Sequence, residues 1–288
     1  MEIKMAEIKL CGVNYIYNKG TPYEVHALQD INLTVGGGIT GILGHTGSGK
    51  STLVQMFNGL VKPTDGKVLI DGEDIWEKPD RVKAARFRAG LVMQYPEYQL
   101  FASTVYEDIA FGPRNMGLPE DEVRSRVYAA AQFSKLPDGL MERSPFDLSG
   151  GQKRRVALAG IIAMRPDFLV LDEPAAGLDP GGRRDILGGI KNFGKASGTS
   201  VVIVSHSMED MASYCDRIIV MASGKIIMDG DCSEVFSRYN ELIGVGLDVP
   251  QITRIASSLV RHGVDIGRDV YTVGYAAGKI LELEEGNR

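Results

Sequence analysis

A glycine-rich segment around residue 45 sharply limits the folds that this sequence allows. It consists of Gly44, His45, Thr46, Gly47, Ser48, Gly49, Lys50 and Ser51, and it fits the pattern GxxxxGK[ST]. Residues 39–43 are apolar and predict a buried strand before it, and residues 51–60 predict a helix after it. In such a unit the glycines let backbone N–H groups turn toward phosphate oxygens, and the helix start adds its positive dipole end. A chance glycine-rich turn with a surface lysine is the alternative; the flanking strand and helix favour a phosphate site.

The last residues of this segment have side chains suited to a nucleotide and its metal ion. Lys50 is expected to neutralise charge on the β- and γ-phosphates, and Ser51 to offer its hydroxyl to Mg²⁺. Thr52, the next residue, is assigned to the same nucleotide site. The sequence therefore predicts that ATP and Mg²⁺ are the ligands of this region.

A second candidate site follows the apolar residues 168–171, where a predicted buried strand ends in Asp172 and Glu173. In open α/β sheets ligands bind beyond the carboxyl ends of the strands. Asp172 is expected to help hold Mg²⁺ through water, and Glu173 to polarise the attacking water as general base. An acidic pair that merely caps a helix is the alternative, and the phosphate segment favours the catalytic role.

The pattern of apolar segments predicts an α/β fold with a mostly parallel sheet, since buried apolar strands alternate with helices. Short alternating segments before residue 36 predict an N-terminal antiparallel β subdomain, and residues 95–164 predict an inserted α-helical subdomain. Residues 241–288 predict a small C-terminal domain, a candidate for dimerisation, after a main domain over residues 5–240. The expected strands are 7–17, 26–35, 39–43, 67–70, 90–93, 168–172 and 201–206, and the expected helices are 51–60, 120–133, 152–164, 183–193, 251–262 and 273–283.

The bulk properties of the chain exclude several classes of function. A nucleic-acid binder usually has a basic domain or stripe, and the net charge of -5 argues against this class, so no nucleic-acid partner is expected. The three cysteines lack metal-ligand spacing, which favours free thiols in a reducing compartment. No apolar run approaches the roughly 18 residues that span a bilayer. Any membrane association is therefore expected to come through a partner.

The segment Leu148-Ser149-Gly150-Gly151-Gln152 resembles the LSGGQ signature of ABC ATPases, and it precedes the acidic strand as in that family. A serine hydroxyl and glycine amides at a helix start provide a second anion cradle. The resemblance implies a P-loop NTPase core in which Ser149, Gly151 and Gln152 face the nucleotide of a second ATPase subunit. Two ATP molecules would then lie between two such subunits, identical or paralogous.

Four further residues match landmarks of the same family. The resemblance implies that Gln94 is the Q-loop glutamine, which contacts Mg²⁺ and signals to a membrane subunit, and that Asp179 belongs to the D-loop. It also implies that His206 contacts the γ-phosphate and that Tyr17 stacks on adenine. Tyr15 is the competitor of Tyr17 and is expected to be a sheet residue. Together with Glu173, His206 and Gln94 are the expected catalytic residues.

A narrower resemblance follows Gln94. Residues 95–101 (YPEYQLF) and 104–113 (TVYEDIAFGP) resemble the ATPases of energy-coupling factor (ECF) transporters and of cobalt and nickel importers. It implies docking on a transmembrane coupling protein, at the cytoplasmic face of the membrane, beside a component that captures a vitamin or metal ion. Glu97, Glu107 and Asp108 are expected to receive arginine-bearing helices of the coupling protein. A solvated acidic face is the alternative for each of these acids.

Other function classes remain as alternatives at this point. Another kind of ABC importer would share every chemical motif. A non-transport ABC protein usually carries two ATPase units or long coiled coils, and this chain has one phosphate segment and no sustained heptad. A P-loop kinase or GTPase would lack the signature and His206.

Overall fold

The computed structural model describes residues 6–264, 266–267 and 270–286. Its centre is a six-stranded sheet with the order β10-β9-β3-β8-β7-β6, in which β10 alone is antiparallel to its neighbour among the described strands. The strands are β3 (Ile39–Gly44), β6 (Ala89–Val92), β7 (Phe168–Asp172), β8 (Ser200–Val204), β9 (Arg217–Ala222) and β10 (Lys225–Asp231).

Both faces of this central sheet are buried, which explains why its strands read as continuous apolar runs. Side chains alternate across a strand. In β7, Leu169 and Leu171 accordingly pack in one hydrophobic cluster while Phe168 and Val170 pack in another. The helices that flank the sheet are α1 (Lys50–Phe57), α2 (Pro79–Arg88), α6 (Pro180–Ser197) and α7 (Met208–Tyr214). The carboxyl ends of β3, β7 and β8 consequently meet at one edge, where the predicted chemistry lies.

A second, antiparallel sheet precedes and follows the phosphate segment in the chain, with the order β2-β1-β4-β5. Its strands are β1 (Ile8–Tyr17), β2 (Val25–Val35), β4 (Asp65–Ile70) and β5 (Glu73–Asp74). The inward side chains of this sheet, such as Leu10 and Leu28, share a core with Phe57 of α1. The Tyr17 hydroxyl at the end of β1 hydrogen-bonds the Thr52 hydroxyl near the start of α1, so these two ends lie together.

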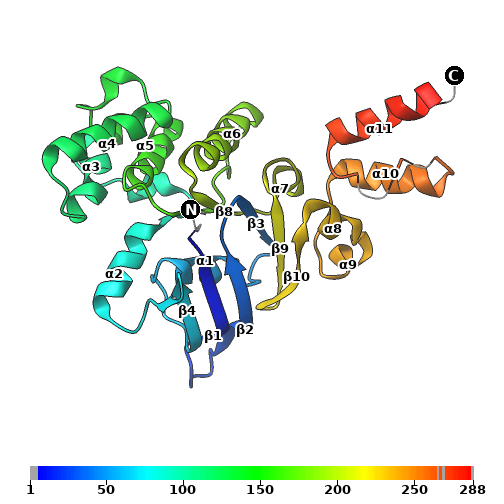
Figure 1. Ribbon diagram of the computed structural model, residues 1–288, viewed down its shortest axis with the longest axis horizontal. Coiled ribbons are helices and arrows are strands. Elements are labelled where there is room, and N and C mark those ends of the chain that lie inside the picture. The colour runs from blue at the N-terminus through cyan, green and yellow to red at the C-terminus, as the bar shows by residue number, and fades with distance from the viewer. Residues whose placement is uncertain (1–5, 265, 268–269, 287–288) are drawn as a thin grey trace, which may run out of the picture.

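The segment between β6 and β7 is almost entirely helical and forms a lobe at one end of the molecule (Figure 1). It contains the 3₁₀ helices η1 (Pro96–Gln99), η2 (Asp138–Leu140) and η3 (Pro145–Asp147), and the helices α3 (Val105–Asn115), α4 (Glu120–Phe133) and α5 (Gly150–Ile162). The fold class expected from the sequence is therefore confirmed, with its parallel-rich sheet, antiparallel sheet and inserted helices.

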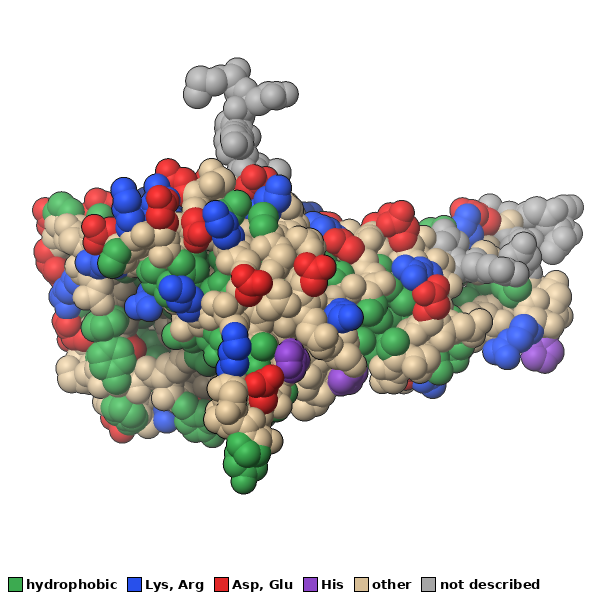
Figure 2. Space-filling model, turned by 90° about the horizontal axis from the view of Figure 1, so that it is seen from below, with side chains coloured by type: hydrophobic (Ala, Val, Ile, Leu, Met, Phe, Trp, Pro, Cys, Tyr) green, Lys and Arg blue, Asp and Glu red, His purple; other side chains and the backbone are tan. Residues whose placement is uncertain are grey.

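The C-terminal part of the chain forms α8 (Cys232–Ser237), α9 (Tyr239–Gly244), α10 (Gln251–Arg261) and α11 (Val273–Gly286). Helices α10 and α11 project from the body as an arm on the side opposite the helical lobe (Figures 1 and 2). They have a small core of their own, made by Ala256, Ile266, Val270 and Ala276. Helix α9 spans the expected boundary at residue 240, and Leu242 packs in the main core. The division of the chain at that residue, and a role of residues 241–288 in dimerisation, stay predictions.

Within the described ranges, no helix is both long and apolar enough to cross a membrane.

Candidate active site

The turn from β3 into α1 is built around Gly49, which precedes the first helical residue with a left-handed backbone (φ 101°). A Cβ atom at Gly49 would lie 2.4 Å from the carbonyl oxygen of Ala27, so the close approach of β2 also requires glycine. The N–H groups at the start of α1 are therefore left open toward the cavity beside them, which is the arrangement that binds anions.

A cavity of about 540 Å³ opens beside this turn, which is within the range of small-molecule sites. It is lined by residues from both sheets and from the loop after β6. The predicted site residues that line it are Tyr17, Thr46, Gly47, Gly49, Lys50, Ser51, Thr52, Gln94, Asp172, Glu173 and His206. The structure thus brings together residues from distant parts of the chain that were assigned separately to nucleotide, metal and catalysis.

Lys50 is held in the curve of the phosphate segment. Its Nζ donates hydrogen bonds to the carbonyl oxygens of Gly44 at 2.7 Å and His45 at 2.9 Å. Burial lowers the pKa of the Lys50 ammonium, and the nearby Glu173 and Asp172 carboxylates oppose that effect. The two hydrogen bonds hold the Lys50 side chain in place along the cavity that it lines. Ser48, also in the segment, has a buried hydroxyl without a hydrogen-bond partner among the described residues.

Three oxygen donors suited to Mg²⁺ meet at the same edge of the sheet. The Ser51 hydroxyl donates a hydrogen bond to the Asp172 carboxylate, and Gln94 lines the same cavity. Burial raises the pKa of Asp172, whereas the bond from Ser51 and the charge of Lys50 lower it. Hydroxyl, amide and carboxylate oxygens are the ligands that Mg²⁺ takes in phosphate-binding sites. The residues present therefore fit this ion.

Glu173 is the first residue after β7 and has a left-handed backbone (φ 51°). Its N–H donates to the carbonyl oxygen of Val204 at 2.9 Å, which fixes the turn against β8. The Glu173 side chain is 14% exposed, and its Oε1 lies 2.9 Å from Nδ1 of His206, whose ring is 73% exposed. A sheltered carboxylate held by a histidine at the cavity wall can orient and polarise a water molecule.

The far wall of the cavity is formed by the antiparallel sheet. The Tyr17 hydroxyl hydrogen-bonds the Thr52 hydroxyl at 3.0 Å, and Val25, which pairs with Tyr17 across the sheet, lines the cavity with Ala27. The Tyr17 ring and the side chains of Val25 and Ala27 offer apolar surface of the kind that an aromatic base packs against. Val25 and Ala27 were not predicted from the sequence, because their place at the cavity depends on the packing of the antiparallel sheet against α1.

The signature segment lies outside this cavity. Ser149 caps α5: its hydroxyl accepts from the N–H of Gln152 at 3.4 Å, and the Gln152 side chain accepts from the N–H of Ser149 at 3.0 Å. Gly150 and Gly151 are exposed, with no atom within 4 Å of the place of a Cβ. Asp179 caps α6 by accepting from the N–H of Gly182 at 2.7 Å. Ser149, Gly151, Gln152 and Asp179 are thus not brought to the cavity within one chain.

The acids expected to receive a membrane partner are occupied inside the molecule. Glu97, 16% exposed, forms an ion pair with the buried Arg154 at 3.0 Å, so its carboxylate is already paired within the chain, and its contact with a membrane partner stays a prediction. Asp108 accepts hydrogen bonds from the N–H groups of Phe101 and Ala102, and burial raises its pKa despite these bonds.

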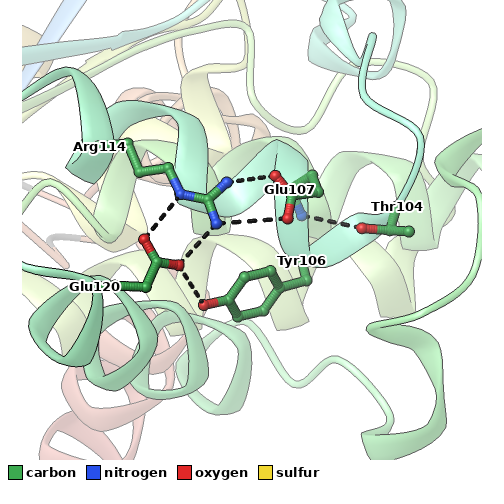
Figure 3. A network of polar contacts seen from close by, with 5 residues as sticks. All are labelled: Thr104, Tyr106, Glu107, Arg114 and Glu120. Carbon is green, nitrogen blue, oxygen red and sulfur yellow. Dashed lines mark hydrogen bonds and ion pairs between the residues drawn. The ribbon is translucent and has the colours of Figure 1, made fainter.

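Glu107 belongs to a surface network that joins α3 to α4 (Figure 3). Arg114 lies between Glu107 and Glu120 and pairs with both, and Tyr106 donates its hydroxyl to Glu120 at 3.3 Å. The Arg114 guanidinium holds the pKa of Glu120 below its usual value. The Glu107 carboxylate is therefore already paired with Arg114 inside the helical lobe.

The family model described as ABC transporter matches residues 28–176, a span that contains the phosphate turn, the signature and the acidic strand. The chain belongs to the ABC transporter family. As an ABC ATPase it binds and hydrolyses ATP.

Curated relatives indicate which group of ABC ATPases this chain resembles. The energy-coupling factor transporter ATP-binding protein EcfA2 of Caldanaerobacter subterraneus subsp. tengcongensis is 52% identical over 282 residues, which cover 98% of this ABC ATPase and 99% of the relative. The EcfA2 protein of Clostridium acetobutylicum is 49% identical over 96% of this chain and 98% of its own.

Solved structures agree with this assignment. The structure of cbiO1 from Clostridium perfringens, part of the ABC transporter complex cbiONQ, has a TM-score of 0.73 and 39% identity, over 88% of this chain and 98% of that chain. A dimer of the ATP-binding cassette MJ0796 bound to ADP and Pi has a TM-score of 0.70 and 28% identity, over 78% of this chain and 98% of that chain.

Proposed function

We propose that this ABC ATPase energises the uptake of a vitamin or metal ion through an ECF-type membrane transporter. The observation that carries the proposal is the sequence identity of 52% and 49%, over nearly the full length of the chain, to two ECF transporter ATP-binding proteins. The chain would act at the cytoplasmic face of the membrane, as a peripheral subunit on a transmembrane coupling protein beside a substrate-capture component.

In the proposed mechanism the residues of the cavity have separate roles in ATP hydrolysis. Lys50 and the amides of the phosphate turn bind the phosphates, and Ser51, Asp172 and Gln94 would hold Mg²⁺. That ion would supply charge neutralisation at the phosphate oxygens. Glu173 accepts a proton from the attacking water, and His206 holds the carboxylate in place from the open side.

We also propose that two such subunits complete each other's sites. Gly150 and Gly151 lie at the exposed start of α5, with no atom of the described residues within 4 Å of the place of a Cβ, and a helix start attracts an anion. The dimer of MJ0796 bound to ADP and Pi supports this arrangement. Asp179 would lie at the same contact between subunits.

Ser149→Arg should block hydrolysis and leave ATP binding by the single chain close to normal, because a bulky cation would fill the second cradle. A mixture with Lys50→Ala should regain part of the activity, since one site of each mixed dimer then has neither defect and the other has both. ATP turnover of the mixture, compared with each variant alone, measures this. A mixture no more active than the sum of its parts would count against a sandwich of identical subunits.

The surface proposed for the coupling protein is an aromatic groove beside η1, with a volume of about 280 Å³. Its side chains include Phe87, Pro96, Leu100, Phe101 and Phe111. Phe101 and Phe111 are 59% and 50% exposed and meet edge to face at 4.9 Å between ring centroids. Because the nearby acids are paired internally, apolar contact in this groove, rather than free charge, would provide most of the docking energy.

Replacing both Phe101 and Phe111 with Ser should reduce recovery of the membrane partner about 10-fold or more, since each buried aromatic anchor contributes roughly 1–2 kcal/mol. ATP binding should persist, because neither ring lines the nucleotide cavity. The measurement is a pull-down from detergent-solubilised membranes, with an ATP titration beside it.

Tyr128→Ser is the matched control, since Tyr128 is an exposed aromatic residue on α4 outside the groove. Wild-type recovery of the coupling protein by the double variant would remove the groove from the docking site. The same pull-down with the unaltered chain tests the transporter assignment: a soluble translation or DNA-maintenance complex in place of membrane subunits would overturn it.

A further inference from the structure

Arg154 is a buried arginine on α5, two residues after the signature glutamine, and its guanidinium joins three segments of the chain. Its side chain is 7% exposed. Nε and Nη2 donate to the two carboxylate oxygens of Glu97 at 3.2 and 3.0 Å. Nη1 donates to the carbonyl oxygens of Ala176 at 2.8 Å and Pro174 at 3.4 Å.

Each of these three segments belongs to a different part of the ATPase. Glu97 lies in η1, whose Pro96 lines the aromatic groove. Arg154 lies in the first two turns of the helix that Ser149 caps. Pro174 and Ala176 lie in the short loop between Glu173, which lines the cavity, and Asp179, which caps α6.

The chemistry of the contact makes these segments move as a unit. A bidentate arginine–carboxylate pair fixes both distance and orientation, and a planar guanidinium leaves its remaining donors in set directions. Separating a buried pair exposes an uncompensated charge to an apolar interior. A shift of η1 therefore carries Arg154 with it, and with Arg154 the start of α5 and the loop beside Glu173.

We infer that the Arg154–Glu97 pair is a positioning pair for ATP hydrolysis, which sets the loop after Glu173 and the signature helix in register with the groove segment. Neither Arg154 nor Glu97 is among the residues that line the nucleotide cavity. It acts on the rate of turnover through the placement of Glu173 and of the signature, and leaves the walls that bind ATP unchanged.

Arg154→Lys keeps the charge but cannot reach the Glu97 carboxylate and both carbonyl oxygens at once. We expect kcat for ATP to fall on the order of 10-fold to 100-fold, as for a small misplacement of catalytic groups. The KM for ATP should stay within about two-fold, because Tyr17 and Lys50 are untouched. Glu97→Gln keeps the size of the side chain and removes its charge, so it should also lower kcat. If Arg154→Lys does not fold, Glu97→Gln alone tests the inference.

Arg155→Lys is the matched control on the same helix. Arg155 also donates to two carbonyl oxygens, those of Ser134 and Lys135, and pairs with Asp185 at 3.7 Å; among the described residues no hydrogen bond or ion pair joins it to η1 or to the loop after Glu173. It should leave kcat within about two-fold of the original value. The double variant Glu97→Gln with Arg154→Lys should be no slower than the slower single variant, because both changes break one interaction.

Amide hydrogen exchange supplies a readout independent of turnover. Each single variant should exchange faster both at residues 95–101 and at residues 174–179, whereas Arg155→Lys should change neither. The inference is overturned if the folded single variants keep kcat and lose only thermal stability. It is also overturned if they raise KM alone, if their effects on kcat multiply in the double variant, or if exchange rises in one of the two segments only.

Discussion

Glu173→Gln is expected to lower ATP turnover by about 10² to 10⁴-fold, the usual effect of losing a general base. The amide keeps the size of the side chain but cannot accept the proton of the attacking water. ATP binding should persist, since Lys50 and the phosphate turn are unchanged. Steady-state hydrolysis and a nucleotide titration on the same preparation check both parts.

Two features make this experiment specific. Glu209→Gln, on α7 close to His206 in sequence, is the control, because Glu209 does not line the cavity. With hydrolysis blocked, the ATP-bound dimer should also last longer, which chromatography in the presence of ATP would detect. Wild-type turnover by Glu173→Gln would remove this residue from the mechanism.

Lys50→Ala is expected to weaken ATP binding by roughly 100-fold, or about 3 kcal/mol, because a partly buried phosphate would lose its compensating cation. The same change removes the hydrogen bonds that tie the carbonyl oxygens of Gly44 and His45 to the side chain. Binding should therefore be measured in Mg²⁺ together with the melting temperature.

The comparison with Lys62→Ala separates a site effect from a general loss of charge, because Lys62 lies over the ring of Trp76 and does not line the nucleotide cavity. Unchanged affinity and unchanged hydrolysis in Lys50→Ala, with the protein folded, would mean that the glycine segment is only a turn.

The sequence predicted those parts of the fold and candidate site whose signals are local. A buried parallel strand is a continuous apolar run, so β7 was bounded correctly from Phe168 to Asp172. The phosphate segment specifies its own turn because glycine at position 49 leaves room for β2 and for the left-handed backbone. Glu173 and His206, which follow β7 and β8, could be placed near one another because carboxyl ends of parallel strands share an edge.

The rest depended on contacts between distant residues, which a local pattern does not contain. From the sequence, Glu97 was expected to be an acid on the surface. Its partner Arg154 could not be inferred, because it lies 57 residues further along the chain. Strands β9 and β10 were missed, although β9 flanks β3 in the sheet and has a buried apolar run as long as that of β7. Val25 and Ala27 became cavity residues only when the antiparallel sheet packed against α1.

The left-handed backbone at Glu173 affects which residues can replace it during evolution. A left-handed conformation costs a residue with a Cβ about 1–3 kcal/mol, and glycine adopts it freely. Selection for a stable fold and selection for turnover therefore favour different side chains at this position. In a related protein that binds nucleotide without hydrolysing it, glycine or asparagine at this position would raise thermal stability. The residue at position 173 would therefore indicate whether a relative still hydrolyses ATP.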